Sequence, residues 1–309
     1  MARRIKIFGE RNTGTRAVKQ MLCHAPHVVL QQGSLAIEKR GASWCQLHEA
    51  VDLYYQDDWR RLYMDALRDD GRQDSDQIFA WKHAAPDWGM GYLKHQIDVI
   101  FMVRNPYSWA LSTACKPYHI KGPRTSDFTK FITRPWMTER RDNVSAVLPS
   151  VMDLWTTKAT AYSDFAQMAE HFGMTPYFML FEDFILDPKA AVSHALNVFG
   201  IPTDGVNKID ASTKLGGRNL TKAQQFYRDE NWKLRLTRSA VAQINTRLDV
   251  KLVKGFGYPI LNPDDFPQEL PELEQRRFSY EMMALDPVPS WEKSTPQVSH
   301  GKACTTATA

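Results

Sequence analysis

Residues 4–16, with the sequence RIKIFGERNTGTR, constrain the fold more than any other stretch of the chain. A short β-type run at Ile5–Phe8 leads into a turn that contains Gly9 and Gly14, and a helical pattern follows at Thr15–His24. A strand, a glycine-containing loop and a helix N-terminus in this order direct backbone N–H groups and the positive end of the helix dipole at one point. The stretch therefore predicts a site for a bound phosphate or sulfate.

The spacing of the two glycines equals that of the ATP-binding Walker loop, G-x-x-x-x-G-K-[ST]. In this chain Thr15 and Arg16 follow Gly14, so the Walker lysine and the hydroxyl residue that holds Mg²⁺ are both missing. We therefore interpret the loop as one that holds a phosphate group without the residues that a Walker loop uses for Mg-ATP.

Apolar β-type runs alternate with helical patterns along the chain. The β-type runs lie at Ile5–Phe8, Ile78–Trp81, Val99–Val103 and Tyr177–Phe181, and the helical patterns at Thr15–His24, Asp58–Arg68, Tyr107–Lys116, Val151–Phe172, Pro188–Phe199 and Thr237–Val250. This alternation predicts an α/β fold of three layers, with a mostly parallel central sheet flanked by helices. We expect one domain over residues 1–285 and a flexible tail over 286–309, where periodicity is lost and Pro, Ser and Thr are frequent.

The composition favours no special class of protein. A net charge of +4 on 309 residues is too small to indicate a nucleic-acid partner. The four cysteines are scattered without a CxxC pair, which is typical of reduced thiols. No apolar run reaches the length of a membrane span, and strand-like sequence begins at about Arg4, so we expect a cytoplasmic protein with neither signal peptide nor membrane partner. The oligomeric state is left open.

Residues 100–112, IFMVRNPYSWALS, form a second strand-to-helix junction. A buried strand ends before Arg104, Pro106 suits the first turn of a helix, and Ser112 follows eight residues after the arginine. Because open α/β sheets bind ligands at the carboxyl ends of their strands, Arg104 should face the same crevice as the glycine loop. An arginine can hold a phosphate through two parallel bonds, and a hydroxyl can add a third. The alternative is an arginine that binds helix carbonyl groups and a surface serine.

The two stretches together, GERNTGT and VRNPYSWALS, resemble the two nucleotide-binding signatures of the PAPS-dependent sulfotransferases. In that family the first holds the 5′-phosphosulfate of 3′-phosphoadenosine 5′-phosphosulfate (PAPS), and an Arg and a Ser eight residues apart hold its 3′-phosphate. Further landmarks are similar in order and spacing: Phe181-Glu182-Asp183, Asp187-Pro188, Val198–Pro202, Phe226-Tyr227, Trp232, Leu236, Ile244-Asn245, Leu248 and Phe256–Tyr258. The resemblance runs from about residue 4 to residue 259 and implies a P-loop-like nucleotide-binding core.

The resemblance also implies which residues bind the donor. It places them at Arg11, Asn12, Thr13, Gly14, Thr15 and Arg16 on the 5′ side, at Arg104 and Ser112 on the 3′ side, and at Arg218 and Lys222 in a loop that closes over the 3′-phosphate. For this last loop an ordinary solvated segment is the alternative.

Two departures from the family pattern concern the catalytic groups. Asn12 stands where the family commonly has Lys or Arg, and Arg16 where a second Thr is common, so the cation on the bridging oxygen is either Arg11 or Lys82. The family often shows K-x-H with the His as catalytic base, whereas here His83 follows Lys82 directly.

An imidazole with an ordinary pKa of about 6.5 suits a base at neutral pH, so His83 is the candidate for this role. The alternative is a strand-end histidine bound to the backbone, in which case a carboxylate, Glu49, Asp52 or Asp87, serves as the base.

The resemblance therefore implies an enzyme that moves a sulfuryl group in line from PAPS to a hydroxyl or amine, with a general base and no metal, and leaves 3′,5′-ADP. Aromatic and basic residues in the stretches 31–77, 84–95 and 116–145 favour a saccharide or a polar small molecule as the acceptor. Two alternatives stay open: an ATP-dependent small-molecule kinase, and a non-catalytic nucleotide-binding protein of the same fold.

Overall fold

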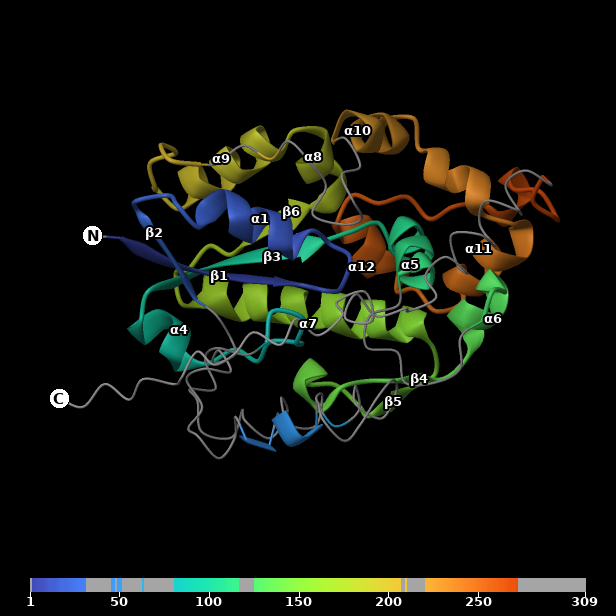
Figure 1. The fold of residues 1–309 in the computed structure, drawn as a ribbon, viewed down its shortest axis with the longest axis horizontal. Helices are drawn as coiled ribbons and strands as arrows, with labels where there is room; N and C mark the ends of the chain where they lie inside the picture. The colour runs from blue at the N-terminus through green and yellow to red at the C-terminus, as the bar shows by residue number, and fades with distance from the viewer. Residues whose placement is uncertain are drawn as a thin grey trace.

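The computed structural model describes residues 2–31, 46–47, 49–51, 63, 81–116, 125–206, 209 and 220–271. Within them, four strands form a parallel sheet: β1 (Arg3–Gly9), β2 (Val28–Gln31), β3 (Ile97–Val103) and β6 (Tyr177–Leu180), in the order β2-β1-β3-β6 (Figure 1). The prediction of an α/β fold with a parallel sheet is confirmed. The β-type run Ile78–Trp81, the helical pattern Asp58–Arg68 and the tail 286–309 lie wholly or almost wholly outside the described residues.

The order in which the chain adds strands to the sheet reverses between β1 and β3. The chain passes from β1 to β2 at one edge, and from β3 to β6 at the other. At the carboxyl ends of the central pair, Phe8 lies opposite Phe101 and Gly9 opposite Met102. A parallel sheet opens into a crevice at such a switch point, because the connections from the two strands leave toward opposite edges. The loops after Gly9 and Val103 flank this point.

One face of the sheet is covered by α1 (Thr15–Leu22), α8 (Phe181–Leu186) and α9 (Pro188–Val198) (Figure 1). Successive side chains of a strand point to opposite faces, so Ile5 and Ile7 of β1 and Ile100 and Met102 of β3 face this layer. They pack with Val18 and other apolar residues of the helices. Burial of this apolar surface fixes the direction in which α1 leaves the glycine loop.

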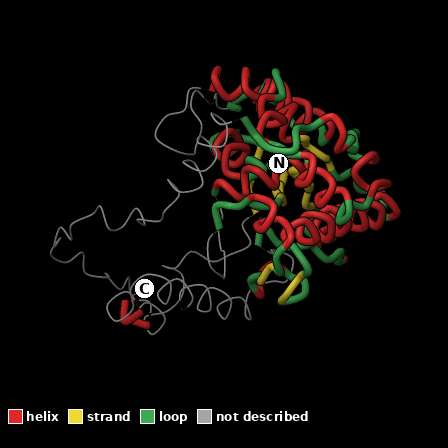
Figure 2. Tube along the Cα trace, turned by 90° about the vertical axis from the view of Figure 1, so that its right-hand side faces the viewer, coloured by secondary structure: helices red, strands yellow, loops and turns green. Residues whose placement is uncertain are grey.

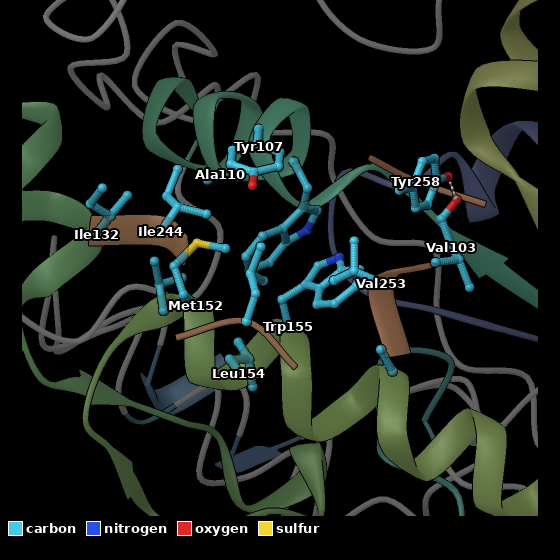
Figure 3. Close-up of a cluster of buried hydrophobic side chains, with 14 of the residues drawn as sticks. Val103, Tyr107, Ala110, Ile132, Met152, Leu154, Trp155, Ile244, Val253 and Tyr258 are labelled. Carbon is cyan, nitrogen blue, oxygen red and sulfur yellow. Dashed lines mark hydrogen bonds between the residues drawn. The ribbon is translucent and has the colours of Figure 1, made fainter. Parts of the chain in front are cut away.

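The opposite face of the sheet carries the larger core, which includes Phe8, Phe101 and Val103. It is built from α4 (Met90–Lys94), α5 (Pro106–Cys115), α6 (Phe128–Thr133), α7 (Val151–His171), α11 (Arg238–Asn245) and α12 (Val250–Gly255). Figure 3 shows Met152 and Trp155 of α7 pointing toward side chains of α5. Seen from the side, the strands are enclosed by helices (Figure 2).

Side chains before the first turns set where the helices begin. Asn105 accepts hydrogen bonds from the backbone of Tyr107 and Ser108, with Pro106 at the first position of α5. Ser150 caps α7, and Asp187 caps α9 ahead of Pro188. These residue types are favoured at such positions because they satisfy N–H groups that lack a partner within the helix. The predicted helices beginning at residues 107, 151 and 188 are therefore found within one residue of their expected starts.

Two sequence-based boundaries differ from the structure. The expected helix Thr237–Val250 ends early, at Asn245 of α11, and a separate helix, α12, begins at Val250, where the Asp249 side chain caps it by accepting from the Leu252 N–H. Phe181 begins α8 instead of ending β6. The other elements are β4 (Trp136–Met137) paired with β5 (Val147–Leu148), η3 (Arg140–Asp142), α10 (Leu220–Arg228), η4 (Asn231–Arg235) and η5 (Pro263–Asp265). None of the described helices is both long and apolar enough to cross a membrane.

Candidate anion-binding site at the sheet switch point

The loop between β1 and α1 is tightly folded. The Thr13 side chain and its backbone N–H both donate to the carbonyl of Glu10, at 2.6 and 3.3 Å. Asn12 and Gly14 have positive φ angles, 67° and 89°, and Gly14 ends the loop as the N-cap of α1. No side chain of the described residues caps α1. The Ala17 N–H donates to the Gly14 carbonyl at 2.8 Å, so the N–H groups of Thr15 and Arg16 are the ones that a ligand can use, and the positive end of the helix dipole favours an anion there.

Gly9 permits this fold because there is no room for a side chain. A Cβ atom at this position would lie 2.6 Å from Met102 Cβ, 2.7 Å from Thr13 Oγ1 and 2.8 Å from Thr15 Cγ2. The end of β1 is therefore packed directly against β3 and against both hydroxyl residues of the loop.

Arg104, at the end of β3, is buried and holds four oxygen atoms. Its Nε donates to Ser108 Oγ and its Nη2 to the Ser108 carbonyl, both at 3.0 Å, while Nη1 donates to the Asn12 carbonyl at 2.7 Å. Nη2 also donates to the hydroxyl of Tyr227 on α10, at 2.6 Å. The guanidinium carbon lies 4.4 Å from the centre of the Phe181 ring. Arg104 thus joins the glycine loop to α5, α8 and α10.

Ser108 is the hydroxyl residue bound to Arg104, and sequence reasoning missed it. It lies in the first turn of α5, and its Oγ lies 3.0 Å from Glu182 Oε1. Ser112, the residue expected from the eight-residue spacing, is half-buried one turn further along α5. Residues four apart share one face of a helix, so the two serines lie on the same side of α5.

Glu182 has the contacts of a structural residue. Its carboxylate accepts from the Asn105 N–H at 3.3 Å and from the Tyr258 hydroxyl at 2.7 Å. Burial and the adjacent carboxylate raise the pKa of Tyr258 well above its ordinary value, so Tyr258 stays protonated and donates. Glu182 therefore links the beginning of α5 to α8 and to the chain that follows α12.

Lys82 and His83 lie against the end of β1. The Gly9 N–H donates to the Lys82 carbonyl at 2.9 Å, and the Gly9 carbonyl lies 2.5 Å from His83 Nδ1. A carbonyl can only accept, so Nδ1 carries the proton and Nε2 carries the lone pair. Within the described residues Nε2 has no partner. Burial first, and then the charges of Lys82 and Arg11, lower the pKa of His83 well below 6.5, so the ring is neutral at pH 7.

Three cations lie close together at α1. Lys82, Arg16 and Lys19 form no ion pair within the described part of the chain. Burial, together with the charges of Lys19 and Arg16, lowers the pKa of Lys82. A lowered lysine pKa means that the positive charge is unfavourable where it stands, and an anion bound nearby would relieve this.

Arg11 is placed differently from the three cations. Its buried guanidinium bonds to Glu10 Oε1 at 2.8 Å and to both carboxylate oxygens of Asp142 at 3.0 Å. Burial alone would lower its pKa, but the charges of Glu10 and Asp142 outweigh this effect and raise it. Lys158 of α7 completes the cluster by contacting both carboxylates. The positive charge of Arg11 is thus already balanced inside the protein.

The remaining candidates lie at the margin or outside the described residues. Lys222 is exposed on α10, and Arg218 falls outside the described part, as does Asp52. Glu49 is exposed, and Asp87 accepts from Asn143 Nδ2 at 2.9 Å. Among the described residues, no three His, Cys, Asp or Glu side chains form a group suited to a metal ion.

Together these residues define an α/β protein with a parallel four-stranded sheet and a positively charged switch point. A scan against models of protein families finds no match to the chain, and a search of curated proteins finds no relative.

Proposed function

We propose that the chain is a sulfotransferase that moves a sulfuryl group from PAPS to a hydroxyl or amine of a saccharide or polar small molecule. One observation carries the proposal: Lys82, Arg16 and Lys19 lie close together at α1 and form no ion pair within the described residues, and a buried arginine, Arg104, lies at the same switch point. This arrangement suits a ligand with separate anionic groups, which is the character of PAPS.

The residues present fit such a donor. The first turn of α1, with Thr13, Gly14 and Thr15, would hold its 5′ end, and Lys82 and Arg16 would neutralise it. Arg104 would hold the 3′-phosphate through the N–H of Nη1 that has no partner among the described residues, and Ser112 lies on the same side of α5 as Ser108. The donor supplies an activated sulfuryl group, and the protein supplies position and charge.

His83 and Lys82 have suitable chemistry for the transfer itself. His83 Nε2 would take the proton of the acceptor group, because the ring is held by its other nitrogen. Its low pKa makes it a weak base in the free protein, and an anion bound beside Lys82 would raise that pKa. Of the two cations that the sequence offered for the leaving oxygen, Lys82 is the one that has no carboxylate partner among the described residues, so we assign it this role.

The test is thermal unfolding with a panel of nucleotides. A ligand that binds only the folded state stabilises it by about 2.7 kcal/mol at a hundred times its Kd. We expect 3′,5′-ADP to raise the unfolding temperature by several degrees, and 5′-AMP, which lacks the 3′-phosphate, to raise it much less. A larger effect of ATP with Mg²⁺ would favour the kinase alternative, and no effect of 3′,5′-ADP at millimolar concentration would contradict the proposal.

A second measurement separates an enzyme from a nucleotide-binding protein. Labelled PAPS is incubated with the protein and a set of sugars and polar alcohols and amines, and transfer of the label is measured. Transfer to one acceptor class supports the enzyme. Binding of 3′,5′-ADP without transfer to any acceptor would favour the non-catalytic alternative.

A further inference from the structure

We infer that Lys158 is a positioning residue, which fixes His83 relative to the glycine loop from the middle of α7. The inference rests on the proposed function for what His83 does, but not for how His83 is held.

Lys158 binds three separate segments at once. Its Nζ lies 2.5 Å from Glu10 Oε2 in the loop after β1, and it also donates to Asp142 Oδ1 in η3 and to the main-chain carbonyl of His83. Two of these contacts are hydrogen bonds, to Asp142 and to His83, and the contact with Glu10 is an ion pair. Lys158 is 1% exposed, and its helix is packed into the main core along the buried stripe that includes Trp155 and Tyr162. The three segments are thus attached to one rigid element.

The charges around Lys158 balance. Arg11 and Lys158 carry two positive charges, Glu10 and Asp142 carry two negative charges, and all four side chains are at most 5% exposed. Burial alone would raise the pKa of Asp142, but Lys158 and Arg11 outweigh it and keep the carboxylate ionised. Apolar residues of the same size often replace such a cluster without loss of stability. A requirement for stability therefore does not explain this cluster, whereas a requirement for exact geometry does.

His83 is held at both ends by this arrangement. Lys158 binds its carbonyl and Gly9 binds its ring Nδ1, so both the backbone and the ring are fixed. The neighbouring Trp81 makes an edge contact with the ring, and Trp81 in turn lies 4.8 Å from the guanidinium of Arg11. These contacts determine where the lone pair of Nε2 points.

The experiment removes the contact between Lys158 and the His83 carbonyl without leaving a buried charge unpaired. The double variant Glu10→Gln/Lys158→Met keeps the cluster neutral and keeps an amide oxygen to accept from Arg11. Histidine ring nitrogens are followed by ¹⁵N NMR, with the His83 signals assigned from their loss in His83→Gln. In the native protein we expect the Nδ1–H form at neutral pH. In the double variant we expect a mixture of both tautomers and a rise in the pKa of His83.

Turnover and donor binding give a second readout. With the proposed reaction, turnover should fall about 10- to 100-fold while the affinity for 3′,5′-ADP is kept, because only the base is displaced. Lys254→Met, a change to an exposed lysine of α12, should alter neither. A folded double variant with the native tautomer and pKa of His83 would overturn the inference. Lack of 3′,5′-ADP binding by the native protein would instead overturn the proposed function, and the NMR result would still decide the positioning role.

If the double variant does not fold, Lys158→Arg takes its place. It keeps the positive charge, but a planar guanidinium cannot meet three acceptors arranged around an ammonium group. We expect a mixture of the two His83 tautomers here as well, with a smaller fraction of the non-native tautomer. A folded variant with a native His83 spectrum would count against the inference.

Discussion

The Nη1 atom of Arg104 lies 2.7 Å from the main-chain oxygen of Asn12, and this bond joins the two loops that flank the switch point of the sheet. The side chain of Asn12 extends the connection, because its Nδ2 lies 3.3 Å from both Thr113 Oγ1 and the Lys116 carbonyl at the end of α5. The two loops therefore form one unit, and a ligand that binds there meets a shape that is already set.

Arg104→Lys should weaken this unit and the site with it. A lysine keeps the charge but cannot span Asn12, Ser108 and Tyr227, and each hydrogen bond to a charged group contributes about 1.5–3 kcal/mol. We expect a lower unfolding temperature and at least a tenfold rise in the Kd for 3′,5′-ADP, measured by calorimetry, which is about 1.4 kcal/mol. Arg238→Lys, a change in a partly exposed ion pair on α11, is the control. If Arg104→Lys bound 3′,5′-ADP with the native affinity, Arg104 would join the two loops but would not bind the ligand.

Lys82→Met should separate binding from stability. Because Lys82 carries its charge unfavourably in the folded protein, its removal should keep or raise the free energy of unfolding without ligand. The same change should weaken the binding of 3′,5′-ADP about tenfold, since a cation facing the anion is lost. Lys94→Met, at the end of α4, should change neither quantity. Weaker folding together with unchanged affinity would contradict an anion site at Lys82.

The low pKa of His83 predicts how stability changes with pH. Below about pH 6.5 the unfolded chain binds a proton at this residue that the folded chain does not, so the free energy of unfolding falls with decreasing pH. The slope approaches about 1.4 kcal/mol per pH unit until the pKa of the folded state is reached. Above pH 6.5 the residue adds no pH dependence.

Urea unfolding at a series of pH values between 7 and 5 measures this slope, and His83→Gln should flatten it while keeping a donor to the Gly9 carbonyl. Asp142, whose pKa is lowered by Lys158 and Arg11 against the effect of burial, stabilises above its unfolded pKa of about 3.9 and loses that effect only at lower pH. The two effects therefore fall in different pH windows. An equally steep slope in His83→Gln would assign the effect to another group.

Gly9→Ala should disrupt the loop. The added methyl would lie within 2.8 Å of Met102, Thr13 and Thr15, which are held by the sheet and the helix, so a loss of about 1–3 kcal/mol is expected from overpacking. Gly89→Ala is the control, because a Cβ there meets nothing within 4 Å. Chemical unfolding measures both variants. Equal stability of the two would mean that the end of β1 can move away from β3.

Local signals in the sequence predicted much of the fold. The apolar runs of β1 and β3, the glycines Gly9 and Gly14, and Pro106 in the first turn of α5 each act within a few residues, and all appear where expected. The strand β2 was missed because its four residues, VVLQ, are too few to show a period. The break between α11 and α12 was missed because the apolar spacing continues across it, although Asp249 is a typical cap.

The cluster beneath the site shows what the sequence could not predict. Arg11 and Asp142 are 131 positions apart, and no local pattern pairs them. A signal for Lys158 was present, since it interrupts the apolar stripe of α7 between Trp155 and Tyr162, and a charge on a buried stripe needs a partner. The identity of that partner depends on the tertiary fold. For the same reason Arg11 looked like a free cation in sequence, whereas the structure pairs it with two carboxylates.

Helix α7 also sets the distance between two of its anchor points, at Trp155 and Lys158. Trp155 donates from Nε1 to the Arg104 carbonyl at 3.0 Å, and Lys158, three residues later, donates to the His83 carbonyl. The end of β3 and the segment at His83 are therefore bound to points about one helical turn apart on α7, and the rise of 1.5 Å per residue sets the distance between these two points. Inserting a single residue between these two positions would rotate one anchor by about 100° relative to the other, and would thereby displace the segment at His83 relative to the end of β3.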